Sequence, residues 1–117
     1  MRVFLLRHAD AAPGHPDESR RLTDHGIAQM QTLAKTLPPQ LFSGIQSVWH
    51  SPYERARHTA QLACELFKIT QPLIPCRDME PATEIEFLAK KLLNTPSDAL
   101  LVGHNPSMEL LASYLLT

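Results

Sequence analysis

Short apolar runs alternate along this chain with segments in which apolar residues recur every three or four positions. The apolar runs cover residues 3–6, 45–49, 72–76 and 99–102, and their length is typical of strands. The segments that follow them have the periodicity of helices that are apolar on one side. Strands that alternate strictly with helices form a mostly parallel sheet with helices on both faces. The pattern therefore predicts an α/β fold, a three-layer αβα sandwich.

Polar residues in front of the helical segments predict where three of the helices begin. Thr23 precedes the first segment and is a favourable N-cap residue. Ser51 with Glu54 three residues later, and Thr83 with Glu86, have the spacing of a capping box. We therefore expect helices that begin just after Thr23, Ser51 and Thr83.

The composition fits an ordinary globular domain. The 117 residues are 44% hydrophobic and 20% charged, so we expect a single domain, residues 1–117, with a modest core. The formal net charge of −1 gives no reason to expect binding to nucleic acid or to an anionic membrane. No apolar run approaches the roughly 18 residues of a membrane span, and the N-terminal run is too short for a signal peptide. We expect a cytoplasmic protein whose two cysteines, Cys64 and Cys76, are free thiols.

Arginine and histidine residues follow three of the four expected strands. Arg7 and His8 end the first apolar run, Arg55 lies in the first turn of the helix after the second, and His104 follows the fourth. The carboxyl ends of parallel strands share one edge of the sheet, and ligands bind at that edge. Helix N-termini at the same edge favour negative charge. We therefore expect these side chains to surround a tetrahedral anion.

Two guanidinium groups and two imidazoles suit the transfer of a phosphoryl group. Guanidinium forks match phosphate oxygens, and a neutral imidazole is a nucleophile toward phosphorus. The cationic side chains then supply the charge stabilisation that metal ions give in other phosphoryl-transfer sites. The chain has no D-x-D or H-E-x-x-H motif, so we expect neither a metal nor another cofactor.

Each of these residues alone has a simpler interpretation. Arg7 and His8 could form a solvated strand end, His104 could pack in the core or cap a helix, and Arg55 could pair with a neighbour on its own helix. The convergence of all of them on one edge of one expected sheet favours the functional interpretation.

Four stretches together resemble the histidine phosphatase superfamily, which has the phosphoglycerate mutase-like fold, and within it the small SixA-type phosphohistidine phosphatases. The stretches are LLRHADA (5–11), RRLTDHG (20–26), SPYERARHTA (51–60) and LLVGHNP (100–106). The resemblance implies a metal-independent phosphatase with a histidine nucleophile. It implies that the substrate is a phosphohistidine on a signalling protein, a histidine phosphotransfer domain, and that inorganic phosphate or sulfate binds in the same pocket.

The resemblance also assigns roles to residues of the four stretches. His8 would be the nucleophile that receives the phosphoryl group and becomes a covalent phosphohistidine intermediate. Arg7 and Arg55 would bind the phosphate oxygens, and His104 would donate a hydrogen bond to one of them. Arg20 corresponds best to an accessory phosphate-binding arginine.

Several features leave alternatives open. Arg21 competes with Arg20 for the accessory role, and Ala9 stands where the superfamily often has glycine. Glu80 is the candidate for the general acid of larger superfamily members, although it lies in an acidic, solvated stretch. A small-molecule phosphomonoesterase that uses Glu80, and a non-catalytic phosphate-binding module, are the other functions we consider.

The end of the chain is short compared with this family, because it stops one helix after His104. We expect this C-terminally short fold to leave apolar residues of the last helix uncovered, among them Leu110, Leu111, Leu115 and Leu116. The protein would then be a monomer or a weak dimer.

Overall fold

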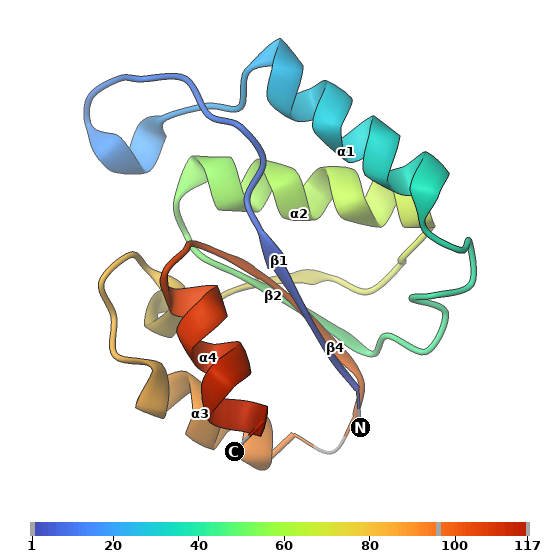
Figure 1. Cartoon of the computed structure of the whole chain (residues 1–117), viewed down its shortest axis with the longest axis vertical. Coiled ribbons are helices and arrows are strands. Elements are labelled where there is room, and N and C mark those ends of the chain that lie inside the picture. Colours follow the sequence, from blue (N-terminus) through green and yellow to red (C-terminus); the bar gives the residue numbers. More distant parts are fainter. Residues whose placement is uncertain (1, 96, 117) are drawn as a thin grey trace.

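A computed structural model of the protein describes residues 2–95 and 97–116 and contains one parallel sheet (Figure 1). The strands lie in the order β1-β4-β2-β3, and every neighbouring pair is parallel. Their bounds are β1 Val3–Arg7, β2 Ser47–His50, β3 Leu73–Pro75 and β4 Ala99–Gly103. The α/β fold and the four expected strands are therefore confirmed.

Four helices cover the two faces of this sheet. In Figure 1, α1 and α2 lie on one face and α3 and α4 lie on the other. Their bounds are α1 Asp24–Thr36, α2 Glu54–Phe67, α3 Ile85–Leu93 and α4 Ser107–Leu116, and two short 3₁₀ turns are η1 Asp17–Ser19 and η2 Arg77–Met79. The three-layer arrangement matches the sequence pattern.

The central strand β4 explains why the core has two halves. All five of its residues are buried, and successive side chains of a strand point to opposite faces. Leu100 and Val102 pack with Ala60 of α2 and its neighbours on one face. Ala99 and Leu101 pack on the other face with the apolar residues of α3 and α4. A continuous apolar run is typical of a strand that is covered on both sides.

Strand β1 lies at the edge of the sheet and is less buried than β4. Its first four residues are half-buried and its last, Arg7, is exposed. Within the described residues β1 pairs with β4 alone, in a register that places Leu5 beside Leu101 and Arg7 beside Gly103. The last residues of β1 and β4 therefore lie side by side at the same edge of the sheet.

The helix starts are only partly as predicted. Thr23 is the N-cap of α1, because its Oγ1 accepts a hydrogen bond of 2.9 Å from the Gly26 N–H. The two capping boxes are wrong: α2 begins after Tyr53 and α3 after Glu84, and neither of these residues makes a side-chain cap bond.

The reason at α2 is that both members of the expected box have other partners. Ser51 lies three residues before the helix, and its Oγ forms a 2.7 Å hydrogen bond with His104 Nε2. The Glu54 carboxylate accepts a 2.7 Å hydrogen bond from Arg57 Nε instead of reaching back to the backbone.

The expectations for the last helix and for the cysteines can also be compared with the structure. On α4, Leu110 is 53% exposed as expected but Leu111 is fully buried, and the side chains of Leu115 and Leu116 lie outside the described part of the structure. Both cysteines are free thiols. In the described ranges, no helix combines the length and the apolar character needed to cross a membrane.

Candidate active site

The ends of three strands are tied together at one edge of the sheet. The His8 N–H donates a 2.9 Å hydrogen bond to the Gly103 carbonyl at the end of β4. The Ser51 N–H, directly after β2, donates a 3.0 Å hydrogen bond to the Val102 carbonyl. His8, Ser51 and His104 therefore leave the sheet side by side, at the edge that the topology predicts.

His8 is held with one ring nitrogen free. Its Nδ1 lies 2.7 Å from the carbonyl oxygen of Ala9. Because a carbonyl only accepts hydrogen bonds, Nδ1 carries the hydrogen, and Nε2 of the neutral ring keeps its lone pair. Burial is the largest cause of the lowered pKa of His8. The Ala9 hydrogen bond raises this pKa, whereas the positive charges of Arg55, Arg7 and Arg20 lower it further.

His104 packs edge-to-face against His8, with the ring centroids 5.1 Å apart. The Tyr53 ring lies 5.4 Å away from the same imidazole. His104 is 3% exposed; its Nε2 is bonded to Ser51, and its Nδ1 is buried without a partner. Burial, and then the charges of Arg55 and His8, lower the pKa of His104 to about 4. The ring is therefore neutral at pH 7.

Arg55 places a guanidinium beside the two histidines from the first turn of α2. The side chain is buried, and its guanidinium carbon lies 5.0 Å from the centroid of the Tyr53 ring. Arg55 Nη1 donates a 2.8 Å hydrogen bond to the Asp17 carbonyl, and the Asp17 carboxylate oxygens lie 3.3 and 3.4 Å from its two Nη atoms. The guanidinium fork therefore holds a carboxylate in this structure.

Arg20 shares that carboxylate. Its Nη1 lies 3.1 Å from Asp17 Oδ1, and its Nε donates a 2.8 Å hydrogen bond to the Ala12 carbonyl. Arg21 instead lines a separate polar hollow with Glu18, Ser19, Pro52 and Glu54. Of the two arginines that compete for the accessory role, Arg20 is the one that contacts Asp17 beside Arg55.

Arg7 and Glu80 lie less centrally. Arg7 is exposed at the end of β1, directly before His8, and its charge acts on the pKa of that histidine. Glu80 follows η2 and is half-buried. Across the described residues, no hydrogen bond or ion pair joins its carboxylate to either of the two histidines.

The sequence did not reveal three residues that the site uses. Asp17 begins the short 3₁₀ turn η1, which has no periodic signal in the sequence, and Ser51 resembles a helix cap. Thr59 lies one turn after Arg55 on the face of α2 that packs against the sheet. Its Oγ1 accepts a 3.0 Å hydrogen bond from the Ala9 N–H and donates a 2.7 Å bond to the Arg55 carbonyl. The four-residue spacing between Arg55 and Thr59 is the signal that could have identified it.

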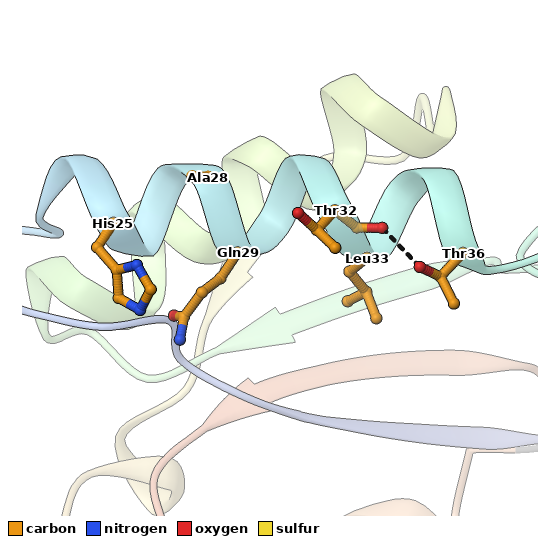
Figure 2. A pocket seen from close by; sticks show the side chains of 6 residues that line it. All are labelled: His25, Ala28, Gln29, Thr32, Leu33 and Thr36. Atoms are coloured by element: carbon orange, nitrogen blue, oxygen red, sulfur yellow. Dashed lines mark hydrogen bonds between the residues drawn. The ribbon is translucent and has the colours of Figure 1, made fainter.

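A second hollow, of about 340 Å³, lies along α1 and has a different character (Figure 2). All the residues that line it come from this one helix: His25, Ala28, Gln29, Thr32, Leu33 and Thr36. Within the hollow, Thr36 Oγ1 donates a 2.8 Å hydrogen bond to the Thr32 carbonyl. It contains a single titratable side chain, so the strand-end cluster is the candidate for chemistry.

Comparison with known protein families agrees with this geometry. The sequence pattern of the histidine phosphatase superfamily (branch 1) matches residues 3–87. The chain belongs to this superfamily. Its members are typically metal-independent phosphatases with a histidine nucleophile. No curated protein sequence matches the chain.

Solved structures share the fold of this superfamily member. The protein histidine phosphatase SixA complexed with tungstate is 22% identical, with a TM-score of 0.82 over 97% of this chain and 75% of its own. A protein from Agrobacterium tumefaciens described as a SixA phosphohistidine phosphatase is 28% identical, with a TM-score of 0.81 over 98% of this chain and 76% of its own. A phosphoglycerate mutase from Plasmodium falciparum is 20% identical, with a TM-score of 0.73 over 97% of this chain and 67% of its own. The phosphoglycerate mutase-like fold is therefore shown, and it is shared by proteins with different substrates.

Proposed function

We propose that this protein is a phosphohistidine phosphatase that removes the phosphoryl group from a histidine of a signalling protein, such as a histidine phosphotransfer domain. The observation that carries the proposal is the free Nε2 of His8 beside the buried Arg55. A nucleophilic nitrogen and a phosphate-binding fork are the two groups that the reaction needs. The tungstate bound to a similar fold supports an oxyanion site here.

In the first step, His8 Nε2 attacks the phosphorus atom in line with the departing imidazole nitrogen of the substrate. The new bond joins Nε2 to phosphorus, and the bond between the substrate nitrogen and phosphorus breaks. Its electron pair returns to the substrate imidazole, which leaves as a neutral ring with a hydrogen on its other nitrogen. Because Nε2 carries no hydrogen, the attack displaces none. The Nδ1–H bond to the Ala9 carbonyl then stabilises the positive charge of the phosphorylated ring.

In the second step, a water molecule attacks the phosphorus atom and releases inorganic phosphate. The electron pair of the Nε2–phosphorus bond returns to His8, and the proton of the water leaves to solvent or with the phosphate. Arg7, Arg55 and Arg20 bind the equatorial oxygens, on which charge is spread in the transition state, and His104 donates a hydrogen bond there. The phosphate oxygens then replace the Asp17 carboxylate as partners of Arg55 and Arg20.

The leaving group decides between a phosphohistidine and a phosphate ester. An alkoxide needs a proton from a general acid as it departs, whereas imidazole is a much better leaving group. Glu80, the candidate acid, makes no bond to the site histidines in the described residues. A phosphoramidate substrate does not need Glu80 to be bonded to these histidines, which supports it over a phosphate ester.

The experiment measures release of phosphate from a phosphorylated histidine phosphotransfer domain, together with trapping of phosphate on the enzyme. The wild-type protein should form an acid-labile phosphoenzyme on His8, and His8→Ala should abolish both trapping and turnover. His25→Ala, on the exposed side of α1, is the matched control and should retain both. Full turnover by His8→Ala would overturn the proposal.

Substrate choice is tested with Glu80→Gln. This variant should hydrolyse the phosphohistidine protein at the wild-type rate. A wild-type enzyme that prefers an alkyl phosphate, and loses this activity in Glu80→Gln, would show a small-molecule phosphomonoesterase instead. Phosphate binding without any trapped phosphoenzyme would show a non-catalytic module.

A further inference from the structure

We propose that Ser51 is a positioning residue whose hydroxyl holds His104 in the tautomer that carries its hydrogen on Nδ1. This inference rests on the proposed function, since it deepens the role of His104 as a donor to the phosphoryl group. It assigns the donor atom, and it names the residue that makes this atom a donor.

Ser51 is placed rigidly. Its side chain is fully buried, and its N–H is bonded to the Val102 carbonyl of β4. Its own carbonyl accepts a 2.8 Å hydrogen bond from His50 Nδ1. The hydroxyl oxygen lies 2.7 Å from His104 Nε2, across a sequence separation of 53 residues. A buried hydroxyl fixed from both sides has little freedom to choose another partner.

The hydrogens around Ser51 decide the direction of that bond. The hydroxyl has one hydrogen to donate and two lone pairs to accept with. The Tyr53 N–H donates to the oxygen at 3.2 Å and occupies one lone pair. If His104 Nε2 also donated, no acceptor among the described residues would be left for the hydroxyl hydrogen. With a phosphate oxygen as acceptor at Nδ1, every group is used only when the Ser51 hydroxyl donates to Nε2, because the opposite direction would turn the Nδ1 lone pair toward the oxygen.

The consequence appears at the other nitrogen of His104. A neutral imidazole that accepts at Nε2 carries its hydrogen on Nδ1. Nδ1 is buried and has no hydrogen-bond partner among the residues that the structure describes. Buried donors without partners are rare, and those at functional sites are explained by a ligand that supplies the acceptor. A phosphate oxygen beside His8, whose ring centroid is 5.1 Å away, is that acceptor.

The environment keeps the imidazole neutral, as the tautomer requires. Burial and the nearby positive charge of Arg55 hold the pKa of His104 at about 4. Tyr53 acts on both residues of this pair. Its backbone N–H is bonded to the Ser51 hydroxyl, and its ring packs against His104 with the ring centroids 5.4 Å apart. The neutral His104 ring therefore donates through its Nδ1 hydrogen, whose position is set by Ser51, and it does not need to become an imidazolium.

The test is nitrogen-15 NMR of the imidazoles in the whole protein at pH 7. In the wild type, Nδ1 of His104 should have the signal of a protonated nitrogen and Nε2 that of an unprotonated one. Ser51→Ala should shift the population toward the Nε2-protonated tautomer. Ser47→Ala is the matched control, because Ser47 Oγ is also buried on the β2 segment but has no partner; it should leave the signals unchanged.

Two further measurements separate a positioning role from a structural one. Inorganic phosphate should shift the Nδ1–H signal of the wild type, and it should do so less in Ser51→Ala. Turnover of the phosphohistidine protein should fall in Ser51→Ala by up to about 10²-fold, the lower end of the loss that follows removal of one oxyanion-hole donor. Ser47→Ala should keep its turnover.

The outcomes of the two proposals are distinct. A wild-type His104 protonated on Nε2, or a folded Ser51→Ala with the wild-type tautomer, would overturn the role of Ser51, whatever the activity. If Ser51→Ala does not fold, the nitrogen-15 spectrum of the wild type alone decides whether His104 carries its hydrogen on Nδ1. Failure to form a phosphoenzyme on His8, with the Nδ1-protonated tautomer present, would overturn the proposed function and leave the tautomer assignment standing.

Discussion

The two histidines of the site are the same residue type in different surroundings. His8 is half-buried and has one free nitrogen, while His104 is almost fully buried and has one bonded and one unpartnered nitrogen. Burial is the largest cause of the lowered pKa of both, and the charge of Arg55 acts on both. The site therefore lowers the pKa of both rings and strengthens the preference for the neutral form that an ordinary histidine already has at pH 7.

The charge of Arg55 should be measurable at His8. Removal of this guanidinium in Arg55→Gln takes away a positive charge that disfavours the imidazolium, so the pKa of His8 should rise toward its ordinary value of about 6.5. An NMR titration of the His8 ring checks this. Arg57→Gln, two residues later and paired with Glu54, should leave the titration unchanged; an equal shift in both variants would contradict the assignment.

The lowered pKa of His104 should make the protein less stable in acid. An unfolded histidine titrates near 6.5, so as the pH falls below that value the unfolded chain binds a proton before the folded protein does. The free energy of unfolding should be unaffected by His104 above pH 6.5 and should fall by roughly 3 kcal/mol between pH 6.5 and 4. Urea unfolding at several pH values measures it.

The control for this acid sensitivity is a histidine substitution elsewhere. His104→Gln should flatten the dependence over pH 6.5 to 4, because the titrating group is gone. His25→Gln, an exposed residue of α1, should retain the wild-type slope. A wild-type slope in His104→Gln would show that another group causes the loss.

Asp17 places a negative charge on the arginines that the phosphate would use. The carboxylate is about half exposed, so its interaction with Arg55 and Arg20 is moderated by solvent. Asp17→Asn should bind inorganic phosphate about fivefold more tightly, a change of about 1 kcal/mol. Calorimetry at low ionic strength measures the affinity. Asp24→Asn, on α1, is the control; weaker binding by Asp17→Asn alone would instead show that the carboxylate orients the arginines.

At the scale of the elements, α2 connects Arg55, the proposed phosphate-binding arginine, to His8, the proposed nucleophile. Small residues, Ala56, Ala60 and Ala63, line its buried face and allow a close approach to the sheet. Thr59 lies on the same side, and its hydroxyl joins the Ala9 N–H to the Arg55 carbonyl. The Ala9 carbonyl is also the group that orients the His8 ring. Helix α2 therefore fixes the Ala9 backbone, and the Ala9 backbone fixes His8.

Replacement of Thr59 by valine removes both hydrogen bonds at nearly constant volume. The Ala9 N–H then lacks its partner in the interior, so Thr59→Val should lower the free energy of unfolding by about 1–3 kcal/mol. It should also lower turnover, because the Ala9 peptide is less well fixed. Chemical unfolding and single-turnover rates measure the two effects. Thr36→Val, which removes an exposed bond to the Thr32 carbonyl, should change the unfolding free energy by less.

The elements themselves could be predicted because their signals are local. Apolar runs and helical periodicity are carried by neighbouring residues, and they identified all four strands and four helices. The strand-end residues then followed from topology, since parallel strands bring their carboxyl ends together. The roles of Ser51 and Glu54 could not be read in this way. A capping-box spacing is also local, but Ser51 is bonded to a histidine 53 residues later, and this competing partner decides where its hydroxyl points.

At the scale of the whole molecule, the site depends on contacts between segments far apart in the sequence. Asp17 and Arg55 are separated by 38 residues, and Ala9 and Thr59 by 50. No periodic pattern marks such pairs, because each partner alone resembles an ordinary loop or helix residue. The sequence therefore predicted that His8, Arg55 and His104 lie at one edge of the sheet, but not which neighbours orient them.

The position of β1 at the rim of the sheet links catalysis to local unfolding. Among the described residues this strand is bonded to β4 alone, and it carries His8 directly after its last residue. Peripheral strands open more readily than central ones in the native state. Whenever β1 detaches, the proposed nucleophile His8 departs with it, so the backbone hydrogen bonds between β1 and β4 limit the fraction of molecules in which the candidate site is assembled. Hydrogen exchange along Val3–Arg7 therefore measures the fraction of molecules in which the candidate site is disassembled.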